Sequence, residues 1–78
     1  MNKVTLSGTV SGLTAVDTGN IAFHLKSDDF SVPCLIEGAK SAVLYNYLIE
    51  GDSVLIDGEM MMHDDAPCVR IVGLEMKK

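Results

Sequence analysis

The sequence predicts a small all-β barrel of five strands with one helix between the third and fourth strands. Three observations carry this prediction. Apolar and polar residues alternate with a period of two along most of the chain, which is typical of half-buried strands. Between residues 40 and 49 the period lengthens to that of a helix. With 78 residues, the chain is long enough for a single domain with one core.

Turn-forming residues separate the predicted strands. Ser11 to Asn20 is rich in Gly, Asp, Thr and Asn, and we expect a turn there. Ser27 to Asp29 is a short connection that predicts a hairpin, and His63 to Pro67 predicts a second turn. Gly8 interrupts the first strand where a bulge or a close approach of another backbone would require glycine. The predicted strands are residues 3–10, 21–26, 30–37, 53–61 and 68–76.

The predicted helix covers Lys40 to Ile49. Val43, Leu44, Tyr47 and Leu48 are spaced as one stripe of a short helix, and we expect this stripe to close one end of the barrel. Tyr45 lies off the stripe, as an interface or stacking residue would.

Five strands with a helix in this position have the element order of the OB-fold, a Greek-key barrel. An SH3-like barrel lacks a helix here, and a ferredoxin-like fold needs two. The sequence therefore predicts one OB-fold domain over residues 1–78.

Composition limits the classes of function. Eleven acidic residues against six Lys and Arg give a net charge of −5, which opposes attraction to phosphate. No apolar run reaches the roughly 18 residues of a membrane span, and the first residues do not resemble a secretory signal. We expect a cytoplasmic protein.

Two cysteines, Cys34 and Cys68, fall on predicted neighbouring strands, and we expect both to be buried, reduced thiols. They lack the further ligands of a structural zinc site. The run from Met60 to Asp65 alternates its side chains between two faces, so we expect no metal site there either. No catalytic or cofactor-binding motif is present, and the sequence predicts a protein that is not an enzyme and needs no cofactor.

Five segments occur in the order expected of one family: residues 1–8, 21–25, 32–36, 47–52 and 54–59. Together they resemble the bacterial single-stranded DNA-binding proteins. The resemblance implies an OB-fold that forms dimers or tetramers and holds single strands on its outer sheet surface. The chain departs from the family in having no Trp, in carrying Ser31 and Glu37 at outward positions of the third strand, and in its short hairpins. It therefore looks like a short, divergent member without the acidic tail.

Strand alternation indicates which side chains face a ligand. Polar and basic residues project outward from the first, second and fifth predicted strands, where they would form a partly basic groove. Taken one at a time, such residues are also ordinary solvated positions. Phe30 is expected in the core by its alternation, although its place at a hairpin end would let it reach a base. The candidate nucleic-acid-binding residues are Lys3, Thr5, His24, Lys26, Phe30 and Arg70, with Ser7 and Thr9 beside them.

Two functions follow from these features. The first is single-stranded DNA binding, with RNA also open, by a homodimer or homotetramer in replication, recombination or repair. The first strand, polar outside and bounded by Gly8, is the expected dimer edge. The alternative is a protein-interaction module of a replication or mobile-element complex that has lost DNA binding. Leu35, Tyr45 and Met60 to Met62 would then contact the partner.

Overall fold

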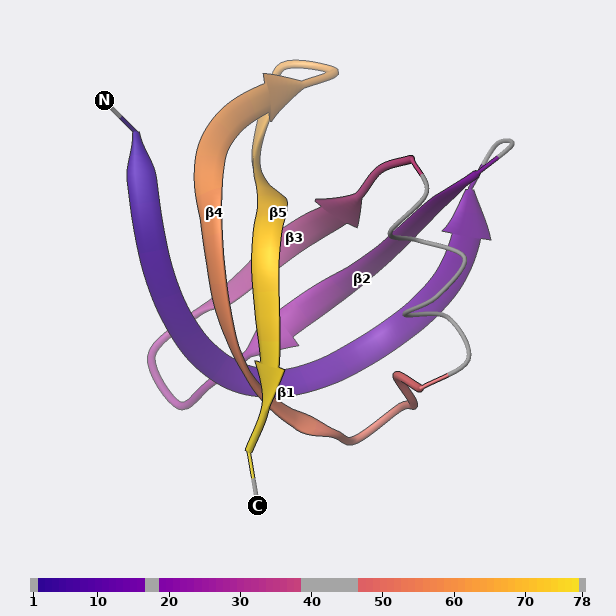
Figure 1. Ribbon diagram of the computed structural model, residues 1–78. Helices are drawn as coiled ribbons and strands as arrows, with labels where there is room; N and C mark the ends of the chain where they lie inside the picture. Colours follow the sequence, from indigo (N-terminus) through magenta and orange to yellow (C-terminus); the bar gives the residue numbers. More distant parts are fainter. Residues whose placement is uncertain (1, 17–18, 39–46, 78) are drawn as a thin grey trace.

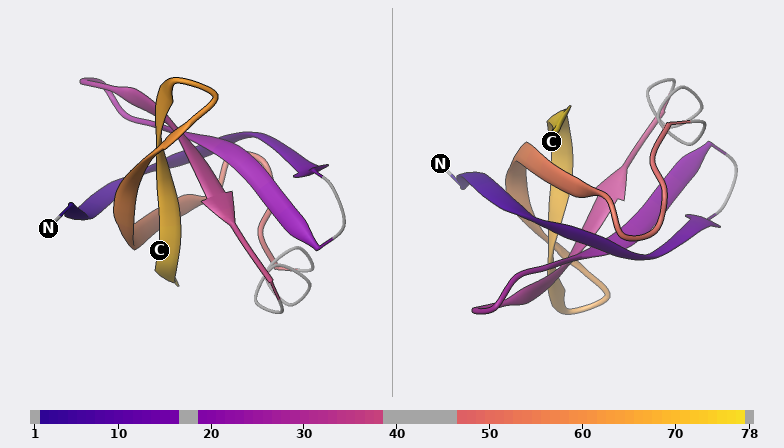
Figure 2. Two further views of the ribbon diagram at one scale, coloured as in Figure 1. Left: turned by 90° about the horizontal axis from the view of Figure 1, so that it is seen from above. Right: turned by 90° about the horizontal axis from the view of Figure 1, so that it is seen from below.

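The structure is a computed structural model that describes residues 2–16, 19–38 and 47–77. Five strands form a closed barrel in the order β1-β2-β3-β5-β4, which is the topology of the OB-fold (Figures 1 and 2). β3 and β5 are parallel, and the other neighbouring strands are antiparallel. The five-stranded barrel predicted from the sequence is confirmed. The strands are β1 Lys3–Val16, β2 Asn20–Lys26, β3 Ser31–Ile36, β4 Ser53–His63 and β5 Ala66–Met76.

β1 is the longest strand and curves around the barrel (Figure 1). Its first half pairs with β4 and its second half with β2, and Thr9 is the residue at which both pairings meet. A Cβ on Gly8 would lie 2.5 Å from the carbonyl oxygen of Lys26, so no other residue fits without movement of the backbone. The prediction of a close backbone approach at Gly8 is confirmed.

The prediction that the first strand ends at Val10 is wrong, because β1 continues to Val16 through a bulge. Gly12 has a φ of 67°, and the register with β2 shifts between Ser11 and Thr14. The backbone N–H groups of Gly12 and Leu13 donate to the two carboxylate oxygens of Glu50, at 2.8 and 3.1 Å. Glu50, which is distant in the sequence, therefore stabilises the bulge at Gly12 and Leu13, where the local sequence predicts a turn.

The core is built from the inward side chains of all five strands. Cys34 and Cys68 belong to it, at 1% and 7% exposure, and both are free thiols on the neighbouring strands β3 and β5, as predicted. Phe30 is half-buried and packs against the core, which confirms the position that its alternation favours. The largest fully buried side chains are Phe23, Leu25, Ile36, Leu48 and Ile56.

Most of the predicted helix, including Val43, Leu44 and Tyr45, lies outside the described residues. At its expected end, residues 47–51 form turns and irregular backbone, and the described residues contain no helix. Leu48 is buried as predicted, but Tyr47 is 70% exposed, so its expected place in the core is wrong. The reason is local. Tyr47 and Leu48 belong to one apolar face only in a helix. In this turn, the side chains of these adjacent residues point in different directions.

The β4–β5 hairpin is tighter than the predicted turn from His63 to Pro67. β4 runs to His63 and β5 starts at Ala66, so two residues form the loop. Asp64 and Asp65 have φ values of 53° and 65°, as a type I′ turn requires at both central positions.

None of the described segments forms a helix that could reach across a lipid bilayer.

Candidate binding face

The outward side chains of β2 and β3 form one surface whose two ends differ. At the first end, Lys26 is aligned with Ser31 of β3 and Thr9 of β1. The next row along the strands holds His24, aligned with Pro33 and Ser11. We call the five polar residues of these rows, Thr9, Ser11, His24, Lys26 and Ser31, the polar end.

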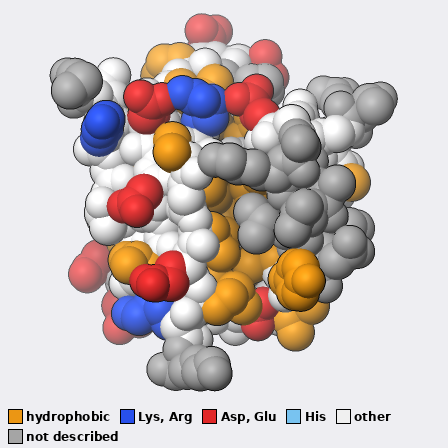
Figure 3. All heavy atoms as spheres, viewed as in Figure 1, with side chains coloured by type: hydrophobic (Ala, Val, Ile, Leu, Met, Phe, Trp, Pro, Cys, Tyr) orange, Lys and Arg blue, Asp and Glu red, His pale blue; other side chains and the backbone are white. Residues whose placement is uncertain are grey.

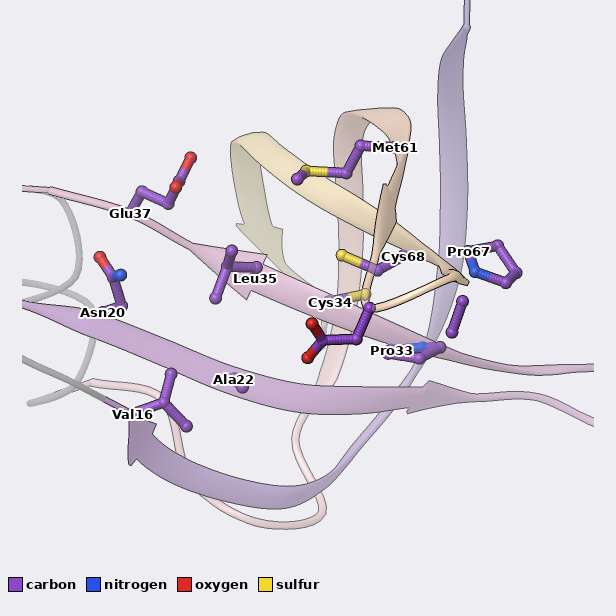
Figure 4. Close-up of a pocket in the computed structure, with 12 residues that line it drawn as sticks. Val16, Asn20, Ala22, Pro33, Cys34, Leu35, Glu37, Met61, Pro67 and Cys68 are labelled. Atoms are coloured by element: carbon purple, nitrogen blue, oxygen red, sulfur yellow. The ribbon is translucent and has the colours of Figure 1, made fainter.

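The second end is a hollow that we call the apolar groove. It has a volume of about 630 Å³ and lies over β2 and β3, beside the β4–β5 hairpin. Figure 4 shows Leu35 rising from β3, with Ala22 of β2 on one side and Met61 and Cys68 on the other. Ala22 and Leu35 are aligned across the strands, one row beyond His24 and Pro33. The apolar side chains that line the groove include Ala22, Pro33, Leu35, Met61, Pro67 and Cys68.

The charged residues of the apolar groove are acidic. Glu37 and Asp64 line it, and none of its described lining residues is Lys, Arg or aromatic. Burial raises the pKa of the Cys68 thiol, and the negative charge of Glu37 raises it further. The field of Glu37 therefore reaches the wall of the groove, which disfavours a phosphate and favours a cation.

The two thiols of the groove are poor nucleophiles. Burial, followed by the neighbouring Cys68 thiol, raises the pKa of Cys34 to about 12. The Cys34 thiol donates a long hydrogen bond, 3.7 Å, to the carbonyl oxygen of Val32. Because the thiolate is the reactive form, Cys34 is inert near neutral pH. Among the described residues, no three His, Cys, Asp or Glu side chains lie close enough together to hold a metal ion.

Lys3 and Thr5, expected beside the other candidate residues, lie around the barrel on the face of β1 and β4. Lys3 is aligned with Glu59, and the Thr5 hydroxyl donates to Asp57 Oδ1 at 2.7 Å. Figure 3 shows that the basic side chains on this side of the molecule lie among acidic ones. An acidic neighbour cancels part of the positive field that a phosphate would need.

Arg70 lies between the two faces. Its backbone is aligned with Leu35 on β3, and its guanidinium forms an ion pair with Glu59 on β4, the residue with which Lys3 is aligned. The structure thus brings His24 and Lys26 together, sets Arg70 one strand from Leu35, and separates His24 and Lys26 from Lys3 and Thr5.

Lys26 also has an acidic neighbour. Hydrogen bonds from the backbone of Gly12 and Leu13 hold the pKa of Glu50 below its usual range, and the positive charge of Lys26 contributes to the same effect. The polar end is therefore a mixed surface whose positive charge is local.

Ala22, Pro33 and Pro67 are groove residues that the candidate set omits. The sequence contains a signal for Ala22 and Pro33, because β2 and β3 carry apolar residues at outward as well as inward positions. Ala22, for example, lies between Ile21 and Phe23. Apolar residues on both faces of a strand indicate a covered or binding surface. Pro67 is part of the groove because the hairpin is short, which the local sequence does not reveal.

The barrel topology defines the OB-fold, and the groove lies over its strands β2 and β3. The sequence matches no protein-family model and no curated protein. Solved structures match it closely. A chain of the Stn1–Ten1 complex of S. pombe superposes with a TM-score of 0.85 at 7% identity, over 100% of this chain and 60% of that one.

Two further structures have the same barrel. The second single-stranded DNA-binding protein (SSBb) of Mycobacterium smegmatis matches with a TM-score of 0.84 at 18% identity, over 96% of this chain and 87% of that one. The asparaginyl-tRNA synthetase of Pyrococcus horikoshii matches with a TM-score of 0.80 at 20% identity, over 95% of this chain but 19% of the enzyme. At these identities the matches establish the OB-fold of this chain.

Proposed function

We propose that this chain binds single-stranded nucleic acid, DNA in the first instance, and acts in replication, recombination or repair as a binding protein without catalytic activity. The observation that carries the proposal is the position of the polar end. It lies on the outer face of β2 and β3, the face with which OB-folds bind oligonucleotides. The M. smegmatis neighbour, a single-stranded DNA-binding protein, is consistent with this use of the fold.

In this proposal the phosphates lie near Lys26 and beside His24, and Arg70 supplies a second cation at the far side. Bases pack on Pro33, which is aligned with His24, because an apolar surface accepts the face of any base. Glu37 repels the strand from the outer part of the groove. The binding is expected to have little sequence preference and to weaken with salt, since each neutralised phosphate releases a counterion.

Fluorescence anisotropy of a labelled oligo-dT tests the proposal, with a labelled duplex as the control. We expect binding of the single strand that is weaker at about 200 mM salt than at about 50 mM, and weaker binding of the duplex. Absence of binding to oligo-dT at tens of micromolar protein in low salt would overturn the proposal.

Charge reversal locates the strand. The Lys26→Glu, Arg70→Glu double variant is expected to lower the affinity for oligo-dT by about 100-fold, since two phosphate contacts become repulsive. Lys3→Glu is the matched control for one charge reversal, because Lys3 lies on the face of β1 and β4, where it is aligned with Glu59. Equal losses in the control and in a Lys26→Glu single variant would contradict the proposed path.

We propose a homodimer or homotetramer that uses β1 as its edge. Within the described strands, residues 3–8 of β1 pair with β4 alone, which leaves their second edge open for a strand of another copy. Sedimentation at micromolar concentration is expected to give a dimer or a tetramer. A monomer under these conditions would contradict the assignment.

Protein binding is the second candidate function, and one observation favours it. The lining of the apolar groove combines apolar side chains with acidic ones, a poor match for phosphate. Two of the residues expected in an interaction surface, Leu35 and Met61, line this groove, and Met62 beside it is 65% exposed. The S. pombe neighbour comes from a complex that its name describes as having two components, Stn1 and Ten1.

A further inference from the structure

We propose that the apolar groove binds a short extended peptide segment of a partner protein, in which apolar side chains alternate with Lys or Arg. The proposal rests on the second candidate function and names the chemistry of its ligand. It does not depend on the nucleic-acid proposal, because it uses the groove and leaves the polar end free.

The shape and lining of the groove fit apolar side chains. Its volume of about 630 Å³ lies within the roughly 300–1,000 Å³ of small-ligand sites, so it holds a few side chains and not a folded domain. Leu35, Met61 and Pro67 offer apolar surface from two sides, and a methionine adapts to different partners through its flexible thioether. Burying such surface supplies the main part of the affinity of a short peptide.

The charge of the groove selects a basic peptide. Glu37 and Asp64 line the groove together with the apolar residues, and the whole chain carries a net charge of −5. The negative charge of Glu37 is the second cause, after burial, of the raised pKa of the Cys68 thiol, in agreement with the place of both residues in the lining. A Lys or Arg of the ligand beside Glu37 would meet an opposite charge, whereas a phosphate would be repelled.

An extended conformation follows from the walls. The groove runs between the surface of two strands and a two-residue hairpin, and in an extended peptide successive side chains point to opposite sides. Apolar side chains then enter the groove while the basic ones between them reach its acidic rim.

Three labelled peptides of equal length test the proposal by fluorescence anisotropy with the full chain. The first alternates Leu with Arg, the second alternates Leu with Glu, and the third alternates Ser with Arg. We expect the Leu–Arg peptide to bind at least about tenfold more tightly than either of the others, because it alone has both features. If the Ser–Arg peptide binds as tightly as the Leu–Arg peptide, charge alone accounts for the binding, and the proposal is overturned.

Two pairs of matched variants locate the peptide. Leu35→Ser is expected to weaken binding of the Leu–Arg peptide about tenfold, whereas Leu55→Ser, an outward leucine on β4, leaves it unchanged. Glu37→Gln is expected to weaken it about threefold, whereas Glu75→Gln on β5 has no effect. Thermal melts of all four variants separate a lost contact from a lost fold.

Amide chemical shifts of the isotopically labelled protein give an independent readout. Addition of the Leu–Arg peptide is expected to shift the resonances of Leu35, Met61 and Cys68 and to leave those of Thr9 and Lys26 in place. Shifts confined to the polar end would overturn the assignment. Displacement of the peptide by stoichiometric oligo-dT, with the same resonances shifted, would also overturn it and would show that nucleic acid binds in the groove. Self-association through the groove would appear as concentration-dependent shifts without peptide and would likewise overturn it.

Discussion

The two ends of the β2–β3 face have the same backbone and opposite chemistry. At one end Lys26, His24 and Ser31 project from the strands, and at the other Ala22 and Leu35 project with Glu37 beyond them. Lys26 and Ala22 are four residues apart on one strand, which is roughly 13 Å. Beneath both ends the inward residues are uniformly apolar, including Leu25 and Phe23.

The comparison separates what the fold requires from what the ligand requires. The inward positions are constrained by the core, so they are apolar at both ends. The outward positions carry no such constraint, so they are free to differ between the two ends. The two proposed ligands, a phosphate backbone at the polar end and a basic peptide in the apolar groove, would use this difference.

Raising the pH is expected to destabilise the fold through Cys34, a thiol in the wall of the groove. The pKa of Cys34 is raised by burial from an ordinary value of 9.0 to about 12, so folding favours the protonated thiol. Its contribution is complete below pH 9.0, the unfolded value, and is lost as the pH rises towards the folded value. At about pH 10.5 the loss amounts to about 2 kcal/mol of the free energy of unfolding.

Urea unfolding followed by circular dichroism at a series of pH values measures this loss. Cys34→Ala is the matched variant, since it lacks the thiol and is expected to show a shallower decline over the same range. An identical decline in the variant would show that other groups dominate the alkaline transition.

Replacing Leu35 by Lys is expected to make the chemistry of the apolar groove more like that of the polar end. Leu35→Lys puts a cation one row from His24 and beside Arg70, while it removes apolar surface from the groove. We expect oligo-dT to bind more tightly by up to about tenfold, which is about 1.4 kcal/mol, and the Leu–Arg peptide to bind more weakly by a similar factor. Anisotropy titrations of both ligands on one preparation measure the exchange, and changes of the same sign for both would refute it.

Glycine in the β4–β5 turn is expected to stabilise the groove wall without changing its surface. Asp65 has a φ of 65°, which costs an L-residue free energy that glycine avoids. Asp65→Gly is therefore expected to raise the free energy of unfolding by about 0.5–1 kcal/mol and Tm by about 2–6 °C. Scanning calorimetry measures the shift, and an unchanged or lower Tm would show that the aspartate makes a compensating contact. Affinity for the Leu–Arg peptide should stay the same.

The smallest expected effect belongs to Glu50 beside the polar end. Its pKa is lowered by the hydrogen bonds from Gly12 and Leu13, so its contribution to stability is present above the unfolded pKa and is lost as the pH falls through the folded one. Glu50→Gln is expected to lose this dependence and to raise the affinity for oligo-dT by less than about threefold, because Lys26 loses an acidic neighbour. Acid unfolding and anisotropy measure the two effects, and Glu75→Gln is the control.

Alternation in the sequence was sufficient for the barrel because the core imposes it on every strand. Leu25, Ile36 and Ile56 could be assigned inward from their period alone. Gly8 could be assigned to a close approach because no side chain fits there. The alternation depends on the burial of one face of each strand, and the contact at Gly8 depends on the approach of the Lys26 carbonyl oxygen.

The errors occur where hydrogen bonds between a side chain and the backbone determine the local structure. Glu50 accepts hydrogen bonds from the backbone of the bulge in β1, and the Asp52 carboxylate accepts one from the Ile49 N–H at 2.9 Å, in the turn that leaves Tyr47 exposed. The groove depends on the parallel alignment of β3 with β5, which brings Pro67 and Cys68 beside Pro33 and Leu35. None of these pairings leaves a periodic trace in the sequence.

The β4–β5 hairpin has a consequence for the order in which the barrel assembles. Its two strands of 11 residues are joined by two residues, so its contacts close short loops, whereas the β1–β4 and β3–β5 pairings span long stretches of chain. Short loops cost the least entropy to close, and hairpins form in about 1–10 μs, well before long-range sheets. We therefore expect this hairpin to form early, and the joining of β5 to β3, which completes the groove, to come late in folding.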